Sequence, residues 1–132
     1  MDKPPLSPFA AFIGISIDEF SKGRVRCSVN LLDHHLNNGG RVHGGVLTSL
    51  ADTAAGAAVR TVRPKGVLTA TTDLSISFIR PPINNELTAI AEVIHAGKTL
   101  YRVEIGVFCG DKLIAKTNAT FMLIEEAKYS TS

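Results

Sequence analysis

The clearest periodic pattern in the chain is a stripe of apolar residues in its first half. Between Gly44 and about Val62, seven apolar residues stand at offsets of 0, 3, 4, 7, 8, 11 and 15, which places them on one face of a helix. They are Leu47, Leu50, Ala51, Ala54, Ala55, Ala58 and Val62. A proline disfavours helical geometry in the residue before it, so Arg63-Pro64 ends this segment. The pattern predicts one long helix.

In much of the remaining chain, apolar and polar residues alternate with a period of two, which is typical of half-buried strands. The predicted strands cover residues 13–17, 24–31, 68–78, 87–95, 102–107 and 115–123. In the third of these, the alternation assigns Leu74 and Ile76 to one face, and Thr71 and Asp73 to the other.

Glycines and prolines separate the strands. Gly97-Lys98 and Gly110-Asp111 lie between strands at hairpin spacing, so the last three strands should form an antiparallel meander. Pro81-Pro82 closes the strand before them. One helix with five or six antiparallel strands predicts an α+β fold whose sheet curves around the helix. The 132 residues should form a single domain over 1–132, with 125–132 as a loose polar tail.

Composition and charge narrow the classes of partner. Apolar residues make up 45% of the chain and charged residues 20%, as in ordinary globular domains. The net charge is +2 without a basic cluster longer than two residues, which gives little attraction for nucleic acid. No run of 18 apolar residues occurs. We expect neither nucleic-acid nor membrane partners.

The cysteines and the N-terminal residues favour a reducing, cytoplasmic location. Cys27 and Cys109 lie 82 positions apart and form no Cys-x-x-Cys motif, so we expect two buried thiols and no disulfide. Pro4-Pro5 stands where a secretory signal would have its apolar stretch.

The first candidate for chemistry is Asp52, the only charged side chain in residues 46–59. A helix of this composition should be packed on its neighbours, and a carboxylate there needs a partner or a function. On a helical wheel Gly45, Ser49 and Gly56 share its face and leave room beside it. A glycine within a helix costs about 1 kcal/mol relative to alanine, which close approach of a ligand or of another element would explain. The structural alternative is a carboxylate held by a neighbouring arginine or hydroxyl group.

The second candidate is the glycine-rich segment of residues 37–45, which leads into the helix. Its asparagines and glycines predict a turn, and Gly44 and Gly45 leave helix N-terminal N–H groups open to a ligand oxygen. These groups lie at the positive end of the helix dipole, where they would stabilise negative charge on a carbonyl oxygen. The segment is either an oxyanion hole or a loop that only reverses the chain.

Other chemistry has weaker support. Asp33, His34, His35 and His43 lack the spacing of a metal site, so we expect no metal ligands. His43 by itself is a base, a ligand or a structural hydrogen-bonding residue. The segment 97–99, Gly-Lys-Thr, lacks the earlier glycine of a phosphate-binding loop.

The spacing of the two candidates has a geometric consequence. Gly44 and Asp52 are eight residues apart, which at about 1.5 Å per residue separates them by about 12 Å. A base or nucleophile has to come within about 3 to 3.5 Å of the carbon whose oxygen the hole binds. We therefore expect a two-fold dimer, in which Asp52 of one subunit and Gly44 of the other act on the same carbonyl group.

The segment His43–Ala54, HGGVLTSLADTA, closely resembles the signature of hotdog-fold acyl-CoA thioesterases of the phenylacetyl-CoA (PaaI) type. Leu74–Pro81 and Gly97–Leu100 resemble the strand and hairpin segments of this family, and the resemblance spans roughly residues 8–124. It implies a curved antiparallel sheet around one long helix, a homodimer joined through sheet edges, and often a homotetramer built as a dimer of dimers.

The resemblance also implies roles for single residues. Asp52 matches the catalytic carboxylate that activates water or attacks directly, and the Gly44 N–H group matches the donor that polarises the thioester carbonyl. Asn37 and His43 would assist on the same subunit as Gly44. Thr71 matches a serine or threonine that helps to orient the water beside the aspartate of the other subunit.

Four further residues are candidates for substrate binding. Gly45 and Ser49 lie near the two catalytic candidates on the predicted helix. Lys98 and Arg102 are possible partners for the phosphates of coenzyme A, or solvated charges at strand ends. A shift of one residue in the loop would replace Asn37 by its neighbour Asn38.

The expected reaction is hydrolysis of a coenzyme A thioester with a medium-chain, long-chain or arylacetyl acyl group. It needs a polarising donor and a base or nucleophile, and no metal or organic cofactor. One alternative is a hotdog hydratase or dehydratase acting on acyl thioesters, in which histidine is the usual base. Another is a module that binds acyl-CoA without cleaving it. The aspartate in the middle of the helix favours hydrolysis.

Overall fold

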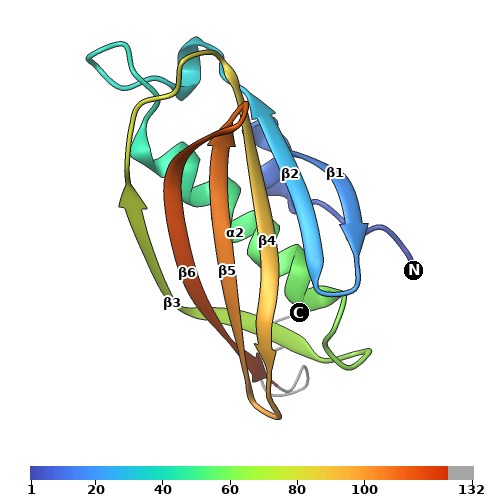
Figure 1. The fold of residues 1–132 in the computed structure, drawn as a ribbon. Helices are drawn as coiled ribbons and strands as arrows, with labels where there is room; N and C mark the ends of the chain where they lie inside the picture. Colours follow the sequence, from blue (N-terminus) through green and yellow to red (C-terminus); the bar gives the residue numbers. More distant parts are fainter. Residues whose placement is uncertain (125–132) are drawn as a thin grey trace.

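A six-stranded antiparallel sheet curves around one long helix (Figure 1). The computed structural model describes residues 1–124, and the tail predicted for residues 125–132 lies outside them. In chain order the strands are β1 (Ser16–Ser21), β2 (Arg24–Asn30), β3 (Leu68–Phe78), β4 (Glu86–Ala96), β5 (Leu100–Cys109) and β6 (Lys112–Ile124). They lie side by side in the order β1-β2-β4-β5-β6-β3. The predicted α+β fold with five or six antiparallel strands is confirmed.

The long helix, α2 (Gly44–Arg60), is the one that the apolar stripe predicts. Its buried face consists of Leu47, Leu50, Ala51, Ala54, Ala55, Ala57, Ala58 and Val59. Five of these residues are alanines, so the helix backbone packs closely against the sheet. In the described part of the chain, no helix is long and apolar enough to cross a membrane.

The last three strands form the predicted antiparallel meander, since β4 pairs with β5 and β5 with β6. β2 pairs with the other side of β4, and β3 pairs with the other side of β6. The chain therefore passes from one side of the sheet to the other through α2. This order leaves β1 and β3 at the two edges.

A β-bulge in β3 interrupts the strict alternation predicted for this strand. Thr71 pairs with Phe121, whereas Asp73, two residues further on, pairs with Thr120, so Thr72 is the extra residue. Phe121 is buried, and Thr71 opposite it faces the helix. The prediction that Thr71 and Asp73 share a face is therefore wrong, because the bulge reverses the phase of the alternation.

The chain before the sheet contains a short helix that the periodicity does not predict, α1 (Pro8–Phe12). The Ser7 side chain caps it by accepting a hydrogen bond of 3.1 Å from the Ala10 N–H group. Gly14 follows with a φ of +83°, a left-handed conformation that suits glycine. The strand predicted over residues 13–17 therefore begins later, at Ser16.

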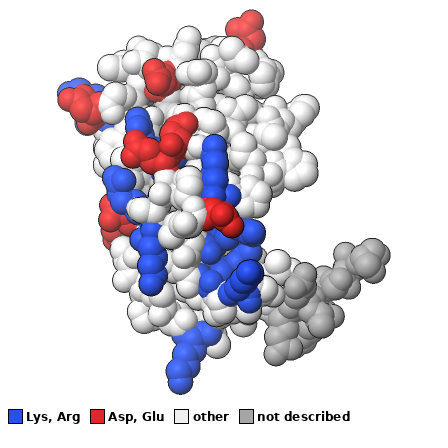
Figure 2. All heavy atoms as spheres, turned by 90° about the vertical axis from the view of Figure 1, so that its right-hand side faces the viewer, with Lys and Arg blue, Asp and Glu red and all other residues white. Residues whose placement is uncertain are grey.

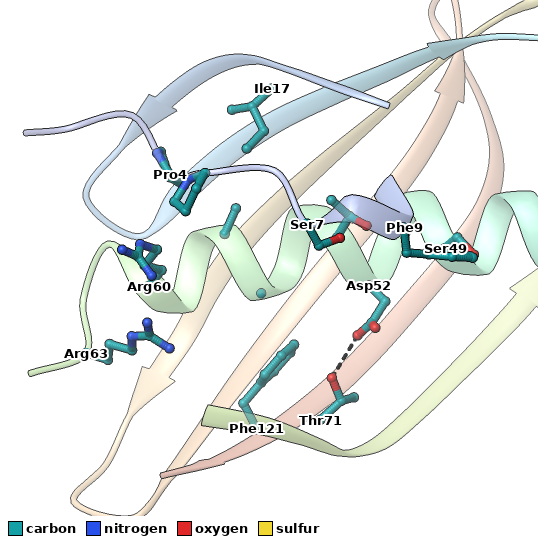
Figure 3. Close-up of a pocket in the computed structure, with 14 residues that line it drawn as sticks. Pro4, Ser7, Phe9, Ile17, Ser49, Asp52, Arg60, Arg63, Thr71 and Phe121 are labelled. Atoms are coloured by element: carbon teal, nitrogen blue, oxygen red, sulfur yellow. Dashed lines mark hydrogen bonds between the residues drawn. The ribbon is translucent and has the colours of Figure 1, made fainter. Parts of the chain in front are cut away.

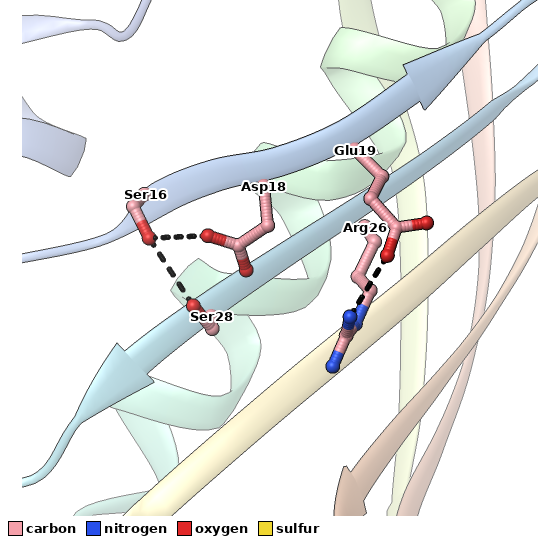
Figure 4. A network of polar contacts seen from close by, with 5 residues as sticks. All are labelled: Ser16, Asp18, Glu19, Arg26 and Ser28. Carbon is pink, nitrogen blue, oxygen red and sulfur yellow. Dashed lines mark hydrogen bonds and ion pairs between the residues drawn. The ribbon is translucent and has the colours of Figure 1, made fainter.

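The β1 edge is polar and irregular (Figure 4). The Ser16 hydroxyl donates to Asp18 over 2.9 Å and lies 3.1 Å from the Ser28 hydroxyl. Arg26 donates to Glu19 over 2.9 Å. Asp18 is also the extra residue of a β-bulge, because the register with β2 shifts between its neighbours Ile17 and Glu19. Bulges and charges of this kind oppose pairing with another sheet.

A buried histidine ties the N-terminal residues to the start of α2. His35 lies in the short helix η1 (Asp33–His35) and is 2% exposed. Its Nδ1 accepts the Leu32 N–H at 2.8 Å, so Nε2 carries the proton and donates to the Ile13 carbonyl at 2.7 Å. The His35 carbonyl in turn accepts the His43 N–H at 2.8 Å. These bonds fix the backbone from which α2 begins.

Both cysteines are free and buried, in agreement with the sequence. Burial, with the charge of Asp18 as a second cause, raises the pKa of Cys27 to about 12. The Cys27 thiol is therefore neutral near neutral pH and packs as a small apolar side chain.

Candidate active site

Asp52 extends from α2 toward β3 and accepts a hydrogen bond there. The Thr71 hydroxyl donates to Asp52 Oδ1 over 2.9 Å within the same chain. This contact exists because the bulge at Thr72 turns Thr71 to the helix side of the sheet. The resemblance places Thr71 beside the aspartate of the other subunit, whereas here its partner is Asp52 of its own chain.

The Asp52 carboxylate is half-buried and has no cationic partner within the described residues. The sequence left open a carboxylate held by a neighbouring arginine or by a hydroxyl group. The structure shows the hydroxyl contact, from Thr71, and no ion pair with an arginine of the described chain. Thr71 holds one carboxylate oxygen in place, and Oδ2 has no side-chain donor among residues 1–124. One oxygen of this carboxylate is therefore open to a hydrogen bond from a ligand or water.

Asp52 lies in a cavity of about 360 Å³, which we call the Asp52 cavity. Ser49, Gly56, Thr71 and Phe121 line it together with Asp52 (Figure 3). The N-terminal segment, which carries Pro4, Ser7 and Phe9, also contributes to its wall. The cavity is large enough for part of a small-molecule ligand.

Gly56 contributes open space to this cavity. A Cβ atom on Gly56 would lie 3.7 Å from Cε2 of Phe121, which is an ordinary van der Waals distance. Packing between α2 and β6 therefore does not require a glycine here. Close approach of a ligand or of another chain remains to explain its cost to the helix.

At the other end of α2, His43 caps the helix. Its Nδ1 accepts the Gly45 N–H at 2.8 Å, which is the N-cap role of a structural hydrogen-bonding residue. The expectation that both glycine N–H groups are open is therefore wrong for Gly45. The Gly44 N–H group is the first of the helix and has no partner one turn earlier.

The Asn37 loop lies beside Gly44. The Asn37 side-chain oxygen accepts the N–H groups of Gly39 at 2.8 Å and Arg41 at 3.2 Å, which closes the loop. A second cavity of about 380 Å³, the Gly44 cavity, is lined by Asn37, Gly44 and Phe78 among others. Asn37 and not Asn38 belongs to this lining.

Close packing explains the absence of a side chain at Gly44. A Cβ atom there would lie 3.2 Å from Cζ of Phe78, which is tighter than most such contacts. The phenyl ring would have to move to admit even alanine. Gly44 thus exposes its backbone to the cavity that it shares with Phe78 and Asn37.

The two candidate groups lie in different cavities of one chain. No residue lines both the Asp52 cavity and the Gly44 cavity. Along the confirmed helix, eight residues of about 1.5 Å each separate Gly44 from Asp52 by about 12 Å. One chain therefore does not bring both groups to the same atom.

The predicted substrate-binding residues divide between these cavities and the surface. Ser49 lines the Asp52 cavity, whereas Gly45 is exposed and lines neither cavity. Lys98 is exposed in the turn between β4 and β5, and Arg102 is exposed on β5 between buried Tyr101 and Val103. Neither cation lines the Asp52 cavity or the Gly44 cavity.

Two arginines that line the Asp52 cavity were not predicted from the sequence. Arg60 and Arg63 line the Asp52 cavity beyond Gly56. The helical wheel contains a signal for the first of them, because Arg60 follows Asp52 and Gly56 at intervals of four residues. Arg63 lies past the end of α2, where no periodicity applies.

One long helix against a curved six-stranded antiparallel sheet is the architecture of the hotdog fold. The profile of the Thioesterase superfamily matches residues 39–116 of this chain, a segment that includes all of α2. The chain belongs to the Thioesterase superfamily.

Individual relatives agree with this assignment. A Halobacterium salinarum protein with a provisional esterase designation is 39% identical over 74% of this chain and 67% of its own length. The acyl-coenzyme A thioesterase PaaI of Escherichia coli is 34% identical over 73% of this chain and 69% of its own. The solved structure of a conserved protein from Pseudomonas aeruginosa matches with a TM-score of 0.86 and 31% identity, covering 90% of this chain and 95% of that one.

Proposed function

We propose that this protein is an acyl-CoA thioesterase that uses Asp52 and the Gly44 N–H group to hydrolyse the thioester of a coenzyme A conjugate. Its membership of the Thioesterase superfamily and its similarity to an acyl-coenzyme A thioesterase support the class of reaction. The observation that carries the residue assignment is the half-buried Asp52 carboxylate in its cavity. It accepts the Thr71 hydroxyl and forms no ion pair among residues 1–124.

In the proposed reaction, the Asp52 carboxylate takes a proton from a water molecule whose oxygen attacks the thioester carbon. The Gly44 N–H group donates to the carbonyl oxygen as it becomes negatively charged. The carbon–sulfur bond then breaks, and the proton on Asp52 passes to the departing thiolate. The products are a carboxylic acid and a free thiol. In the alternative route Asp52 attacks the carbon itself, and the carbon–sulfur bond breaks to release the thiolate. Water then hydrolyses the resulting anhydride, and a proton released in this step neutralises the thiolate.

The proposed site requires two chains. Gly44 and Asp52 lie in separate cavities about 12 Å apart along α2. β3 is an eleven-residue edge strand with one charged residue, Asp73, whereas the other edge, β1, is short and charged. A two-fold axis beside β3 would pair two copies of this edge and set the two α2 helices antiparallel. We propose a homodimer of this kind, with a dimer of dimers as the larger assembly.

The test is a hydrolysis assay on a panel of acyl-CoA substrates, in which a thiol reagent detects free coenzyme A. We expect the Asp52→Asn variant to lose on the order of a hundredfold or more in kcat, as for removal of an acid–base group. The matched control is Asp111→Asn, which changes an exposed carboxylate in the turn between β5 and β6. Hydrolysis by Asp52→Asn at the wild-type rate would exclude the proposal.

A single-turnover reaction in oxygen-18 water separates the two roles of Asp52. Direct attack followed by addition of water to the Asp52 carbonyl places the label in the Asp52 carboxylate, whereas base catalysis never labels Asp52, so label in Asp52 rejects pure base catalysis. Mass spectrometry of the peptide that contains Asp52 distinguishes these outcomes.

The same panel tests the two alternative functions. A non-catalytic binding module would bind acyl-CoA without releasing thiol. A hydratase would add water to enoyl-CoA and leave the thioester intact. Histidine is the usual base of such a hydratase, and Nδ1 of His43 is not free for that role because it accepts the Gly45 N–H group in the helix cap.

A further inference from the structure

The Asp52 cavity extends from Asp52 to a pair of arginines at the end of α2 (Figure 3). Asp52, Gly56 and Arg60 follow one another on one face of the helix, and Arg63 lies beside Arg60. Eight residues of about 1.5 Å each place the Cα atom of Arg60 about 12 Å from that of Asp52. The cavity is thus elongated, with a carboxylate near one end and two guanidinium groups at the other.

Neither arginine has an acidic partner within the described chain. The three ion pairs among residues 1–124 involve other residues. Arg63 donates to the neutral Thr69 hydroxyl over 3.2 Å. Arg60 occupies the last turn of α2, where the helix dipole offsets part of its charge. The cavity thus holds two cations and one carboxylate, and the carboxylate of Asp52 stands about two helical turns away, so the arginine end is net positive.

The environment of Arg63 agrees with this description. Its side chain is half-buried, and burial, followed by the charge of Arg60, lowers the pKa of its guanidinium below the ordinary value. An arginine keeps its proton in proteins, so the lowered pKa marks a charge that lacks compensation. A bound anion would supply that compensation.

The arginines also border a neighbouring surface hollow of about 340 Å³. Arg60, Arg63 and Pro4 line both this hollow and the Asp52 cavity. Lys65 adds a third cation to the hollow, and Asp2 adds one carboxylate. On the face drawn in Figure 2, Lys and Arg gather mainly in the lower half, whereas Asp and Glu lie mostly above them. Arg60 and Arg63 therefore lie where the Asp52 cavity meets a hollow in which cations outnumber carboxylates.

We propose that Arg60 and Arg63 bind an anionic group of the thioester substrate. This inference rests on the proposed function, because it takes the thioester carbon to lie near Asp52. Guanidinium groups bind carboxylates and phosphates through paired hydrogen bonds. Two parts of a substrate can supply such an anion, a phosphate of coenzyme A or a carboxylate at the far end of the acyl chain. Gly56, Ala57 and Phe121 line the space before the arginines, which suits the uncharged stretch that precedes either group.

The test measures binding of four thioethers, which imitate the substrate but have no bond to hydrolyse. A hexyl group and an ω-carboxypentyl group are each attached to coenzyme A and to N-acetylcysteamine, which lacks phosphates. Dissociation constants are measured by calorimetry for the wild type, Arg60→Gln and Arg63→Gln. Lys22→Gln, in the exposed turn between β1 and β2, is the control for loss of one positive charge, and Arg63→Lys tests rescue by a retained charge.

We expect each glutamine variant to weaken binding of the anion-bearing ligand about tenfold or more, as for loss of a charge-assisted hydrogen bond. Arg63→Lys should recover part of the affinity, and Lys22→Gln should bind as the wild type does. Weakening confined to both coenzyme A ligands identifies a phosphate as the anion. Weakening confined to both carboxypentyl ligands identifies the acyl carboxylate.

Two results would overturn the inference: unchanged affinity of both glutamine variants for all four ligands, or no binding of any ligand by the wild type. Circular dichroism of each variant verifies that it is folded. Because the ligands are not hydrolysed, the outcome is separate from that of the proposed function. Arginine-dependent binding by a wild-type protein that fails to release thiol from acyl-CoA would support the anion site and reject the thioesterase.

Discussion

At the scale of single residues, Thr71 shows how one inserted position decides a site. A regular strand would have turned Thr71 away from α2, and the extra residue Thr72 instead directs its hydroxyl to Asp52. The local sequence does not mark the bulge, because Thr71 and the extra residue Thr72 are the same residue type and have the same preference for strands. Similarity to a family identified Thr71, whereas periodicity placed it on the wrong face.

Replacement of Thr71 tests whether it orients the Asp52 carboxylate for the proposed reaction. Thr71→Val keeps the shape and removes the donor, so we expect kcat to fall about tenfold, as for the loss of one hydrogen bond to a charged group. KM should change little, and Thr71→Ser should keep most of the activity because it retains the hydroxyl. Steady-state kinetics on one acyl-CoA measure all three proteins. Equal kcat for the valine and serine variants would reject the orienting role.

The buried Cys27 thiol gives a prediction that depends on pH. Its pKa rises to about 12 on folding from an ordinary value of 9.0, so at pH 8 only about one thiol in ten thousand is the reactive thiolate. We expect Ellman's reagent to modify Cys27 only after denaturation. The Cys27→Ala variant, in which Cys109 is the remaining cysteine, shows how much of the signal comes from Cys109.

The same shift in pKa affects stability. The unfolded chain loses the Cys27 proton above pH 9, whereas the folded chain keeps it to about pH 12. Because the unfolded state then binds fewer protons, the contribution of Cys27 to the free energy of unfolding is present below pH 9 and decreases between pH 9 and 12. Urea unfolding of the wild type and Cys27→Ala should show a difference that decreases over this interval. A constant difference would contradict the raised pKa.

At the scale of elements, α2 serves the core and the site with opposite faces. Leucines and alanines of one face fill the core, and Ser49, Asp52 and Gly56 of the other line the cavity. The period of 3.6 residues separates these faces, which is why the sequence alone identifies both. The sequence predicts the cap of the same helix only in part. The glycines mark the start of the helix, but only the structure shows that the Gly45 N–H group donates to His43 Nδ1.

Gly56→Ala tests the dual use of α2. A methyl group fits at 3.7 Å from Phe121, so the change should raise the free energy of unfolding by about 0.5 to 1 kcal/mol through helix propensity. The same methyl group enters the Asp52 cavity, and kcat/KM for long acyl groups should decrease. Thermal melts and kinetics of one protein preparation measure both effects. Increased stability with unchanged activity on every acyl group would show that no substrate passes Gly56.

At the scale of the whole molecule, the separation of Asp52 from Gly44 favours an active dimer. Asp52→Asn removes the carboxylate, and Gly44→Pro removes the N–H group at a first helical position, where proline is tolerated. Each variant alone should be inactive. In a mixed dimer, one site combines the intact Asp52 of one chain with the intact Gly44 of the other.

Mixing the two inactive variants in equal amounts should therefore restore activity. With free exchange of subunits, half of the dimers are mixed and one of their two sites works, which gives about a quarter of the wild-type activity. Thiol release after unfolding and refolding the mixture measures this recovery, with each variant treated alone as the control. Asn37→Ala replaces Gly44→Pro if the proline variant, whose ring has to fit beside Phe78, does not fold. No recovery from a folded, dimeric mixture would show that each site belongs to one chain.

The sequence by itself determined the single long helix, the meander of the last three strands and the position of Asp52 on a face of small residues. These features depend on contacts between residues that are near in sequence, so that hydrophobic period, glycine turns and proline breaks are sufficient to specify them.

Only the tertiary structure decided which distant residues meet. The contact of Thr71 with Asp52 and the placement of Arg60 and Arg63 at the end of the same cavity arise when β3 and the N-terminal segment pack against α2. A bulge, a left-handed glycine or a turn past a helix end changes the face of the element to which the following side chains point. The hydrophobic periodicity of the sequence does not predict such a change, because the packing of elements that are far apart in the chain determines it.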